Sequence, residues 1–600
     1  MKIKKILAAA LACLLLAGCG ATRTEPLDEG PEAEGAVIAY VPLDDRPDNV
    51  ERVVYLAESL GYQLAMPEAD LYRTRLDGQP LNENGTQYGD MAALYEWVLA
   101  QEAAGCDRYI LSVDQMLSGG LVNSRHTAET LTATLSDGTE MTDGDMLAWM
   151  LRSLSEDPDN RVWLLDSVMR LAPTTGYAGF GLEEYNALRA YGAAPRPELS
   201  QEELSRWGTG VEAVEAGYRL GADGQALDPA AYGLEEARIA DYLAARSRKL
   251  ELTDLLLFWV EDMVADNFRV LIGIDDSSEE DSIQKNEIAY LRAHLRDGDA
   301  LLSGVDDLAF KALAKLYLEE QDSLLAFPHV FVSYYGGTED QPACAYDYQP
   351  LTEIMREHID FFGMKRVAAA ADADVRILVL TQPADTEKKT DYYRALIQEL
   401  KACRRDGTPV ILMDAGNGQY GTAFHEALTK ETELGWLLSY SGFLDMAIVT
   451  GTALSHGVAR YAFLQSGEQT ESTERAFART LADSIIKDFC YKHVVREDLL
   501  AYVRNDLGGD PNNFWAPKID LEAVQARLES GMAAAAADVV KNLERSNFIS
   551  SLEPYGERGW GGIALEDYRF PWDRAFEIGM DIKLGAFTEP HKKLLGVYYQ

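Results

Sequence analysis

Short, continuously apolar runs rich in β-branched residues recur along the chain, and most are followed directly by glycine, aspartate or proline. Apolar residues at consecutive positions are typical of strands that are buried on both faces of a sheet. Amphipathic stretches at 50–60, 90–104, 284–297, 305–320, 351–361 and 390–405 separate many of these runs and predict helices. The predicted strands are VIAYV (37–41), RYILSV (108–113), RVWLLDSV (161–168), RVLIGI (269–274), ALLSGV (300–305), HVFVSYY (329–335), VRILVL (375–380), PVILM (409–413) and MAIVTG (446–451).

A strand-then-helix repeat predicts an α/β fold with mainly parallel strands and helices outside them. This number of strands fits either a (β/α)8-barrel-like fold or a stacked open sheet, and the hydrophobic pattern does not separate the two. Two parts of the chain depart from the repeat. Residues 180–262 carry few strand signals and predict a helical insertion, and residues from about 480 to 550 predict a helix-rich C-terminal part.

The first twenty residues predict the compartment. Lys2, Lys4 and Lys5 precede an apolar run that is too short to span a bilayer, which is typical of a signal peptide. Leu16-Ala17-Gly18-Cys19 resembles the bacterial lipobox, and this resemblance implies cleavage after residue 18 and lipidation of Cys19. We therefore expect residues 1–18 to be a lipoprotein signal peptide and residues 19–35 a flexible tether. The mature protein would be anchored through lipid at the extracytoplasmic face of the cell membrane; a plain secretory signal is the alternative.

The charge balance excludes some partners. The chain has 98 aspartates and glutamates against 55 lysines and arginines, a net charge of −43. Such a chain repels phosphate backbones, so we expect no nucleic-acid partner. It also has no electrostatic attraction to an anionic membrane surface, which leaves the lipid anchor as its expected contact with the membrane.

Acidic residues follow many of the predicted strands. In parallel α/β folds the carboxyl ends of the strands meet at one edge, and reactive groups gather there. Crowded carboxylates cannot all ionise easily, which yields an acid beside a base near neutral pH. We expect a shared polar site, with catalytic residues Asp275, Asp276, Asp45 and Asp114. The expected substrate-binding residues are Asp44, Arg46, Arg170, Asp307, Asp414, Asn417, Gly119, Gly120 and Trp572.

Each of these residues also has a structural alternative. An aspartate after a strand commonly caps the next helix or closes a turn, an arginine can form a structural ion pair, and a glycine pair can be a plain turn. No cofactor is expected, although crowded carboxylates could bind a divalent cation through their oxygens. The sequence contains no HExxH, P-loop or GxSxG motif.

Seven motifs appear in a fixed order along the chain: PLDDRPDN, SVDQMLSGGLVNSR, SVMRLAP, IGIDDSS, GVDD, LMDAGNG and RFPWDRAFE. Together they resemble the bacterial domain of unknown function 4127 family over about residues 36–580. The resemblance implies that residues 36–600 form a single large domain. Two departures stand out, because Asp307 replaces the expected glutamate in GVDD, and TGTALSHG (450–457) lacks the tryptophan and both asparagines of the family pattern WNTxxNTxG.

The strand ending in IGIDDSS is also similar to the Asp-Asp pair of barrel hexosaminidases, which cleave N-acetylated sugars. This second resemblance implies that Asp275 orients the substrate's acetamido group while Asp276 protonates the leaving oxygen. We therefore expect a surface-anchored hydrolase acting on extracellular carbohydrate. The alternatives are a non-catalytic lipoprotein that binds a small molecule or glycan, and a metal-dependent hydrolase.

Overall fold

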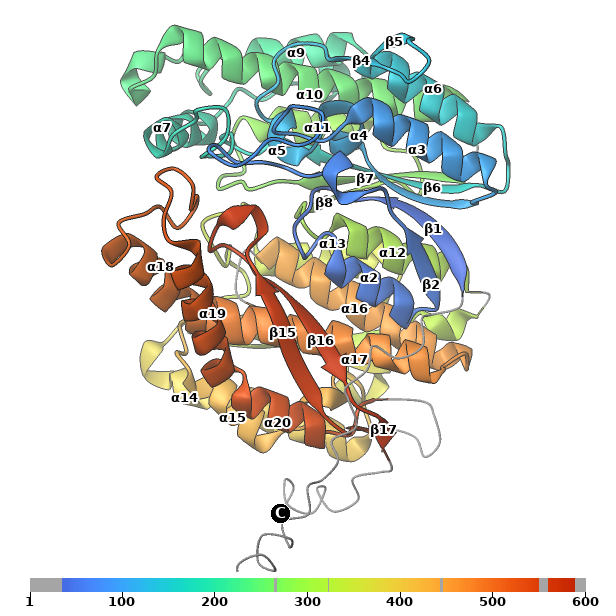
Figure 1. The fold of residues 1–600 in the computed structure, drawn as a ribbon, viewed down its shortest axis with the longest axis vertical. Coiled ribbons are helices and arrows are strands. Elements are labelled where there is room, and N and C mark those ends of the chain that lie inside the picture. Colours follow the sequence, from blue (N-terminus) through green and yellow to red (C-terminus); the bar gives the residue numbers. More distant parts are fainter. Residues whose placement is uncertain (1–34, 264–266, 322, 443–445, 550–558, 589–600) are drawn as a thin grey trace, which may run out of the picture.

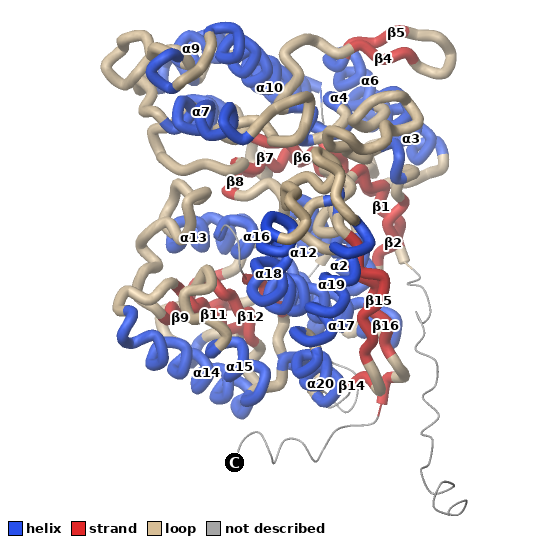
Figure 2. Tube along the Cα trace, turned by 60° about the vertical axis from the view of Figure 1, so that its left-hand side comes forward, coloured by secondary structure: helices blue, strands red, loops and turns tan. Residues whose placement is uncertain are grey.

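Two open parallel sheets organise the molecule (Figures 1 and 2). The computed structural model describes residues 35–263, 267–321, 323–442, 446–549 and 559–588, so the predicted signal peptide and Cys19 lie outside the described residues. The first sheet has the order β2-β1-β3-β6-β7-β8 and the second the order β10-β9-β11-β12-β13, with every neighbouring pair parallel. The open-sheet alternative is therefore confirmed and the barrel alternative is wrong, because the first and last strands of each sheet do not pair with one another.

The bounds of the sheet strands are β1 (Ala36–Val41), β2 (Tyr62–Ala65), β3 (Arg108–Ser112), β6 (Arg161–Val168), β7 (Phe268–Ile274), β8 (Ala300–Ser303), β9 (His329–Tyr335), β10 (Lys365–Arg366), β11 (Val375–Thr381), β12 (Val410–Ala415) and β13 (Ser439–Gly442). The helices that contact them are α2 (Glu51–Ser59), α3 (Met91–Ala103), α4 (Val113–Ser118), α10 (Glu236–Met263), α11 (Gln284–Ala293), α12 (Leu308–Glu319), α13 (Leu351–Phe361), α14 (Lys389–Asp406), α16 (Met446–Ser466) and α17 (Glu471–Ile485). Helix α6 (Asp143–Ser155) packs on α3, α4 and α10, and α15 (Ala423–Glu431) packs on α14.

The layers alternate between helices and sheets (Figure 1). Helices α3, α4, α10 and α11 contact one face of the first sheet. Helix α12 contacts β3, β6 and β7 on the other face, and it also packs against α16, which in turn contacts β12 and β13 of the second sheet. Helix α14 covers the far face of the second sheet through β9 and β11. The two sheets thus share the helices between them.

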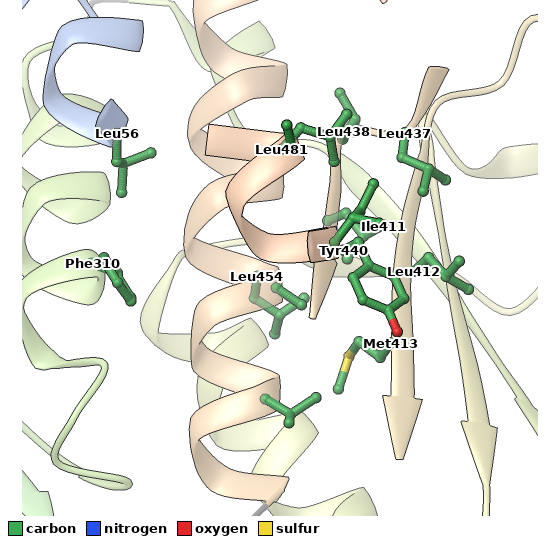
Figure 3. Close-up of a cluster of buried hydrophobic side chains, with 14 of the residues drawn as sticks. Leu56, Phe310, Ile411, Leu412, Met413, Leu437, Leu438, Tyr440, Leu454 and Leu481 are labelled. Atoms are coloured by element: carbon green, nitrogen blue, oxygen red, sulfur yellow. The ribbon is translucent and has the colours of Figure 1, made fainter. Parts of the chain in front are cut away.

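The hydrophobic core is continuous from the first sheet to the second. Along β1, Ile38 and Tyr40 face the shared core, while Ala39 and Val41 face the helices on the opposite side, as the period of two in a strand requires. Figure 3 shows the shared core, where Leu56 of α2 and Phe310 of α12 lie across α16 from strands β12 and β13. Because both faces of each central strand are buried, the strands read as continuous apolar runs.

Eight of the nine predicted strands are confirmed, and the ninth is wrong. Residues 446–451 begin helix α16 instead of forming a strand. A short apolar run cannot distinguish a buried strand from a buried helix, and α16 is enclosed between α12 and the second sheet. Strands β2, β10 and β13 were not predicted, because they are only two to four residues long.

The remaining helices lie mainly in the two regions that carry few strand signals. The segment between β6 and β7 contains α7 (Leu182–Ala193), α8 (Gln201–Leu204), α9 (Thr209–Gly217) and α10. The C-terminal part contains α17, a π-helix over Ile486–Val495, α18 (Arg496–Asn505), α19 (Leu521–Ala535) and α20 (Ala537–Arg545). Among the described residues, we find no helix with both the length and the hydrophobicity needed to span a bilayer.

An antiparallel hairpin of β15 (Ile563–Arg569) and β16 (Gly579–Leu584) follows these helices. In Figure 1 the hairpin, drawn in red, rises beside α17 and α19 toward the first sheet. Its connecting loop carries PWDR, residues 571–574, and Trp572 and Asp573 in that loop adopt positive φ angles of 53° and 48°. Side chains other than glycine rarely adopt such angles, so the surrounding contacts must hold this loop in place.

Close packing between α12 and α16 generates a first prediction. A Cβ atom on Gly451 would lie 1.6 Å from Asp307 Oδ2, so Gly451→Ala should destabilise the protein by about 1–3 kcal/mol even though helix propensity favours alanine. The matched control is Gly217→Ala in α9, where a Cβ atom would come no closer than 3.9 Å to Asn286 Nδ2. Thermal unfolding of both variants checks the prediction, and an unchanged melting temperature for Gly451→Ala would contradict it.

Candidate functional site

A cavity of about 360 Å³ lies at the carboxyl ends of β7 and β8. The walls come from segments far apart in the sequence: the start of α5 (Leu121–Ser124) and the residue after it, the loop after β6, residues 346–347, the start of α16, and the hairpin loop. This is the edge where parallel α/β sheets place ligands. The charged lining residues are Arg46, Arg125, Arg170, Arg496, Arg574, Asp275, Asp276, Asp306 and Asp347.

Asp275 and Asp276 are adjacent in sequence but differ in environment. The Asp275 side chain is buried, forms an ion pair with Arg125, and accepts a hydrogen bond from the Asp276 backbone N–H at 2.9 Å. The Asp276 side chain is 25% exposed and accepts a hydrogen bond from Arg170 Nη1 at 3.2 Å. Burial and the neighbouring Asp275 carboxylate raise the pKa of Asp276, while Arg170 opposes this shift. One carboxylate is therefore fixed and the other faces the cavity.

The other predicted arginine, Arg46, joins the first strand of the domain to the loop after β8. Its guanidinium donates to Asp44 Oδ2 from Nη2 at 2.7 Å and to Asp306 Oδ2 from Nη1 at 3.0 Å. Asp44 is fully buried and does not line the cavity, so it acts by holding Arg46. Asp306, by contrast, lines the cavity with its side chain 20% exposed.

Trp572 forms part of the cavity wall, and Asp45 supports it from behind. The Trp572 Nε1–H donates to Asp45 Oδ1 at 2.7 Å, and the Thr74 backbone N–H donates to the same oxygen at 3.0 Å. The Arg46 guanidinium lies 5.0 Å from the centroid of the Trp572 ring, a cation–π contact. Burial raises the pKa of Asp45 to about 6 despite both hydrogen bonds.

Five predicted aspartates do not line this cavity: Asp44 and the predicted catalytic Asp45, which lie behind its wall, and Asp114, Asp307 and Asp414. Asp114 is buried with Lys249, whose Nζ lies 2.7 Å from Asp114 Oδ1 and which also pairs with Asp166. Asp307 is buried in an ion pair with Lys311 at 2.9 Å. Asp414 lies at the end of β12 in the second sheet. The expectation of one shared rim for all the aspartates is therefore wrong, because the chain forms two sheets with separate carboxyl edges and several of these side chains pair inside the core.

Asp414 and Asn417 belong to a polar cluster of their own at the second sheet. Asp414 Oδ2 lies 3.0 Å from His425 Nε2, and the Asn417 side chain donates to the Ala343 carbonyl at 2.9 Å. The ring of His425 stacks on Phe489, with 4.0 Å between centroids. Neither predicted residue lines the cavity at β7 and β8.

The glycine pair at 119–120 is a turn rather than a ligand contact. Gly119 ends α4 with φ 70°, and a Cβ atom there would lie 2.5 Å from the Tyr88 ring. Gly120, at φ 132°, leads into α5. Glycine is needed because the chain reverses tightly against residues 88–89. The turn directs α5 so that Leu121 and Arg125 line the cavity.

Arg125, Asp306 and Arg574 line the cavity although they were not predicted as site residues. Each of them lies inside one of the ordered motifs: SVDQMLSGGLVNSR, GVDD and RFPWDRAFE. The signal that could have identified the two arginines is that each is a cation inside one of the ordered motifs. The departure at 450–457 lies away from the cavity, because only Ala447 and Ile448 of α16 contribute to the lining.

No group of three or more histidine, cysteine, aspartate or glutamate side chains among the described residues is arranged to hold a metal ion. The cavity carboxylates Asp275, Asp276 and Asp306 are each engaged by an arginine instead. The arrangement is suited to orienting polar groups of a ligand and to transferring a proton from Asp276.

The family model described as "Protein of unknown function (DUF4127)" matches residues 38–581. The chain belongs to this family. No curated protein and no solved structure matches the chain. The match covers both sheets, the cavity and the PWDR loop of this DUF4127 member, and it confirms the family resemblance of the ordered motifs.

A second prediction concerns the buried Lys249. Replacing it with methionine leaves the carboxylates of Asp114 and Asp166 buried without their cation, which should destabilise the protein by about 3–5 kcal/mol. Lys285→Met is the control, because Lys285 pairs with the exposed Asp281 and should cost less than about 1 kcal/mol. Chemical denaturation measures the free energy of unfolding of both variants, and equal losses would contradict the structural role of Asp114.

A third prediction concerns pH. The folded pKa of Asp45, about 6, lies above its unfolded value, so ionisation of Asp45 lowers stability as pH rises from about 4 to 6. Asp45→Asn keeps an oxygen for both hydrogen bonds and removes that loss, so the variant should be more stable than wild type at pH 7.5 by an order of 1–2 kcal/mol. The difference should fade toward pH 4. Melting temperatures of wild type and variant between pH 4 and 7.5 check this prediction. A difference in melting temperature that does not change with pH would show that the pKa of Asp45 is not raised in the folded protein.

Proposed function

We propose that the protein is a glycosidase-like hydrolase that acts on extracellular carbohydrate at the β7–β8 cavity. The observation that carries the proposal is the pair Asp275 and Asp276 at the end of β7, with one carboxylate fixed by Arg125 and the other facing the cavity with a raised pKa. Glycosidases place two carboxyl groups in unlike environments, so that at one pH one is protonated and serves as the acid while the other is ionised.

In this proposal Asp276 is the general acid. Its raised pKa keeps a proton available, and its position on the cavity wall allows that proton to reach the leaving oxygen. Asp275, held in place by its ion pair with Arg125, orients the substrate group that attacks the anomeric carbon, as in substrate-assisted glycoside cleavage. Trp572 supplies an apolar surface against which a sugar ring can stack.

The alternative is a binding protein without catalysis. A cavity between two α/β sheets is also found in two-lobed binding proteins, which close about a hinge. Here the sheets share α12 and α16 and one continuous hydrophobic core, and Figure 3 shows the part of that core that lies between α2, α12, α16 and the second sheet. A continuous core resists the rigid-body opening that such proteins use, and this favours the enzyme over the binding protein.

We also propose that the enzyme is a lipoprotein held at the extracytoplasmic face of the cell membrane. The support is the sequence of the first twenty residues, in which a lysine-rich start and a short apolar run precede Cys19. A lipid anchor would place the cavity outside the cell, where polymeric carbohydrate is accessible.

The fourth prediction tests Asp276 with pairs of aryl glycosides, including N-acetylhexosaminides. Asp276→Asn should lower kcat/KM about 100- to 10,000-fold for a phenyl glycoside, whose leaving group needs a proton. The loss should be much smaller for a dinitrophenyl glycoside, whose leaving group departs unprotonated. Asp275→Asn should lower kcat/KM to a similar extent for both substrates. Wild-type activity should fall as pH rises through the pKa of Asp276, because the acid must be protonated.

Asp281→Asn is the matched control for this experiment. Asp281 lies in the same loop, pairs with Lys285 at the surface and does not line the cavity, so its substitution should leave both rates unchanged. Full activity of Asp276→Asn on the phenyl glycoside would remove that residue from the mechanism. Loss of wild-type activity on chelation, with recovery on adding Mg²⁺, Mn²⁺ or Ca²⁺, would favour the metal-dependent alternative.

A further inference from the structure

The charges that line the cavity do not balance locally. Of its five arginines, Arg46 pairs with Asp44 and Asp306, Arg125 with Asp275, Arg170 with Asp276, and Arg496 with Glu497. Arg574 is the exception, because it forms no ion pair with any residue in the described part of the chain. Its Nε is buried and has no hydrogen-bond partner among the described residues. The Arg574 side chain is half-buried, and a partly desolvated guanidinium without a carboxylate partner favours an anion beside it.

The contacts that Arg574 does make are aromatic. Its guanidinium lies 5.7 Å from the centroid of the Trp572 ring and 6.0 Å from that of Phe576, and both rings line the cavity. Such contacts orient a guanidinium without neutralising it, so its N–H groups remain available to a ligand. The surrounding contacts hold Trp572 and Asp573 at positive φ angles, and in this loop conformation Arg574 lines the cavity.

The surroundings of Arg574 are positive as well. Burial, and then the charges of Arg170 and Arg46, lower the pKa of Arg574 to about 10, and the charge of Asp510 opposes this shift without forming an ion pair. Burial and the charges of Arg125 and Arg170 likewise lower the pKa of His126 to about 3. A second buried guanidinium nitrogen, Arg125 Nε, also lacks a hydrogen-bond partner within the described part of the chain, and Arg125 itself is only 6% exposed. This local excess of cations lies within a chain whose net charge is −43.

We propose that Arg574 forms an anion subsite of the cavity and that the preferred substrates are glycans carrying a carboxylate, sulfate or phosphate substituent. That these glycans are substrates rests on the proposed function, whereas the binding of an anion by Arg574 does not. A guanidinium binds all three groups through paired, charge-assisted hydrogen bonds. If Asp276 is protonated as the general acid, Arg170 is released from its ion pair, and the cavity becomes more favourable to an anion.

The fifth prediction compares acidic and neutral members of matched substrate pairs. The pairs are 4-nitrophenyl glucuronide with glucoside, and N-acetylglucosaminide 6-sulfate or 6-phosphate with unmodified N-acetylglucosaminide. For at least one pair, wild type should prefer the acidic member, and Arg574→Gln should reduce that preference roughly ten- to hundredfold, the usual effect of losing a charge-assisted hydrogen bond. Arg574→Lys should recover part of the preference, because it keeps the charge without the planar fork.

Direct binding separates this inference from the proposed function. At constant ionic strength, sulfate, phosphate and glucuronate should raise the melting temperature of wild type above that in chloride, and Arg574→Gln should abolish the rise for at least one of them. Arg405→Gln is the control, because Arg405 is exposed on α14 and does not line the cavity. Circular dichroism confirms that each variant is folded.

The outcomes are distinct. Stabilisation by an anion through Arg574 without turnover of any glycoside supports the subsite and rejects the hydrolase. Turnover with no preference for an acidic substituent, together with no stabilisation by any of the anions, rejects the subsite and keeps the hydrolase. If Arg574→Gln reduces acidic and neutral turnover equally, Arg574 only shapes the loop, and the subsite is rejected.

Discussion

Buried and half-buried arginine–aspartate pairs hold the candidate site together. Arg46 and Asp306 are 260 positions apart in the sequence, Arg125 and Asp275 are 150 apart, and Arg170 and Asp276 are 106 apart. Each pair joins two loops that leave different strands of the first sheet. Breaking one partner of a buried pair leaves an uncompensated charge, so these contacts fix the relative positions of the loops and make the cavity rigid.

A second buried network extends from the cavity to the C-terminal helices. Asp48, just after the PLDDRP segment, lies 3.1 Å from Arg52 and 3.6 Å from Lys487 of the π-helix. The Asp48 backbone N–H donates to Glu577, which lies three residues beyond Arg574. Burial and Asp48 raise the pKa of Glu577 to about 8. The first and last of the seven motifs are therefore held against the same helix, and the hairpin loop is positioned by the core rather than by local turns.

Much of the fold could be predicted from the sequence, because strands buried on both faces must be apolar at consecutive positions. That reasoning identified the longer strands, such as β7, and failed for α16, whose apolar start satisfies the same pattern. It also identified Asp275, Asp276, Arg46, Arg170 and Trp572, which do line the cavity. It could not separate them from Asp114 or Asp307, because an aspartate after a strand has the same local sequence whether it faces a cavity or pairs with a lysine in the core.

The sequence by itself determined the alternation of buried strands and amphipathic helices, the family and the strongly acidic charge of the chain. Only the tertiary structure decided which polar residues meet. The strands divide into two open sheets, so the aspartates that follow them separate into a cavity at β7 and β8, a cluster at β12, and ion pairs inside the core. The physical reason is that local sequence sets burial and hydrogen-bonding preference, whereas the position of a charge depends on partners more than one hundred residues away.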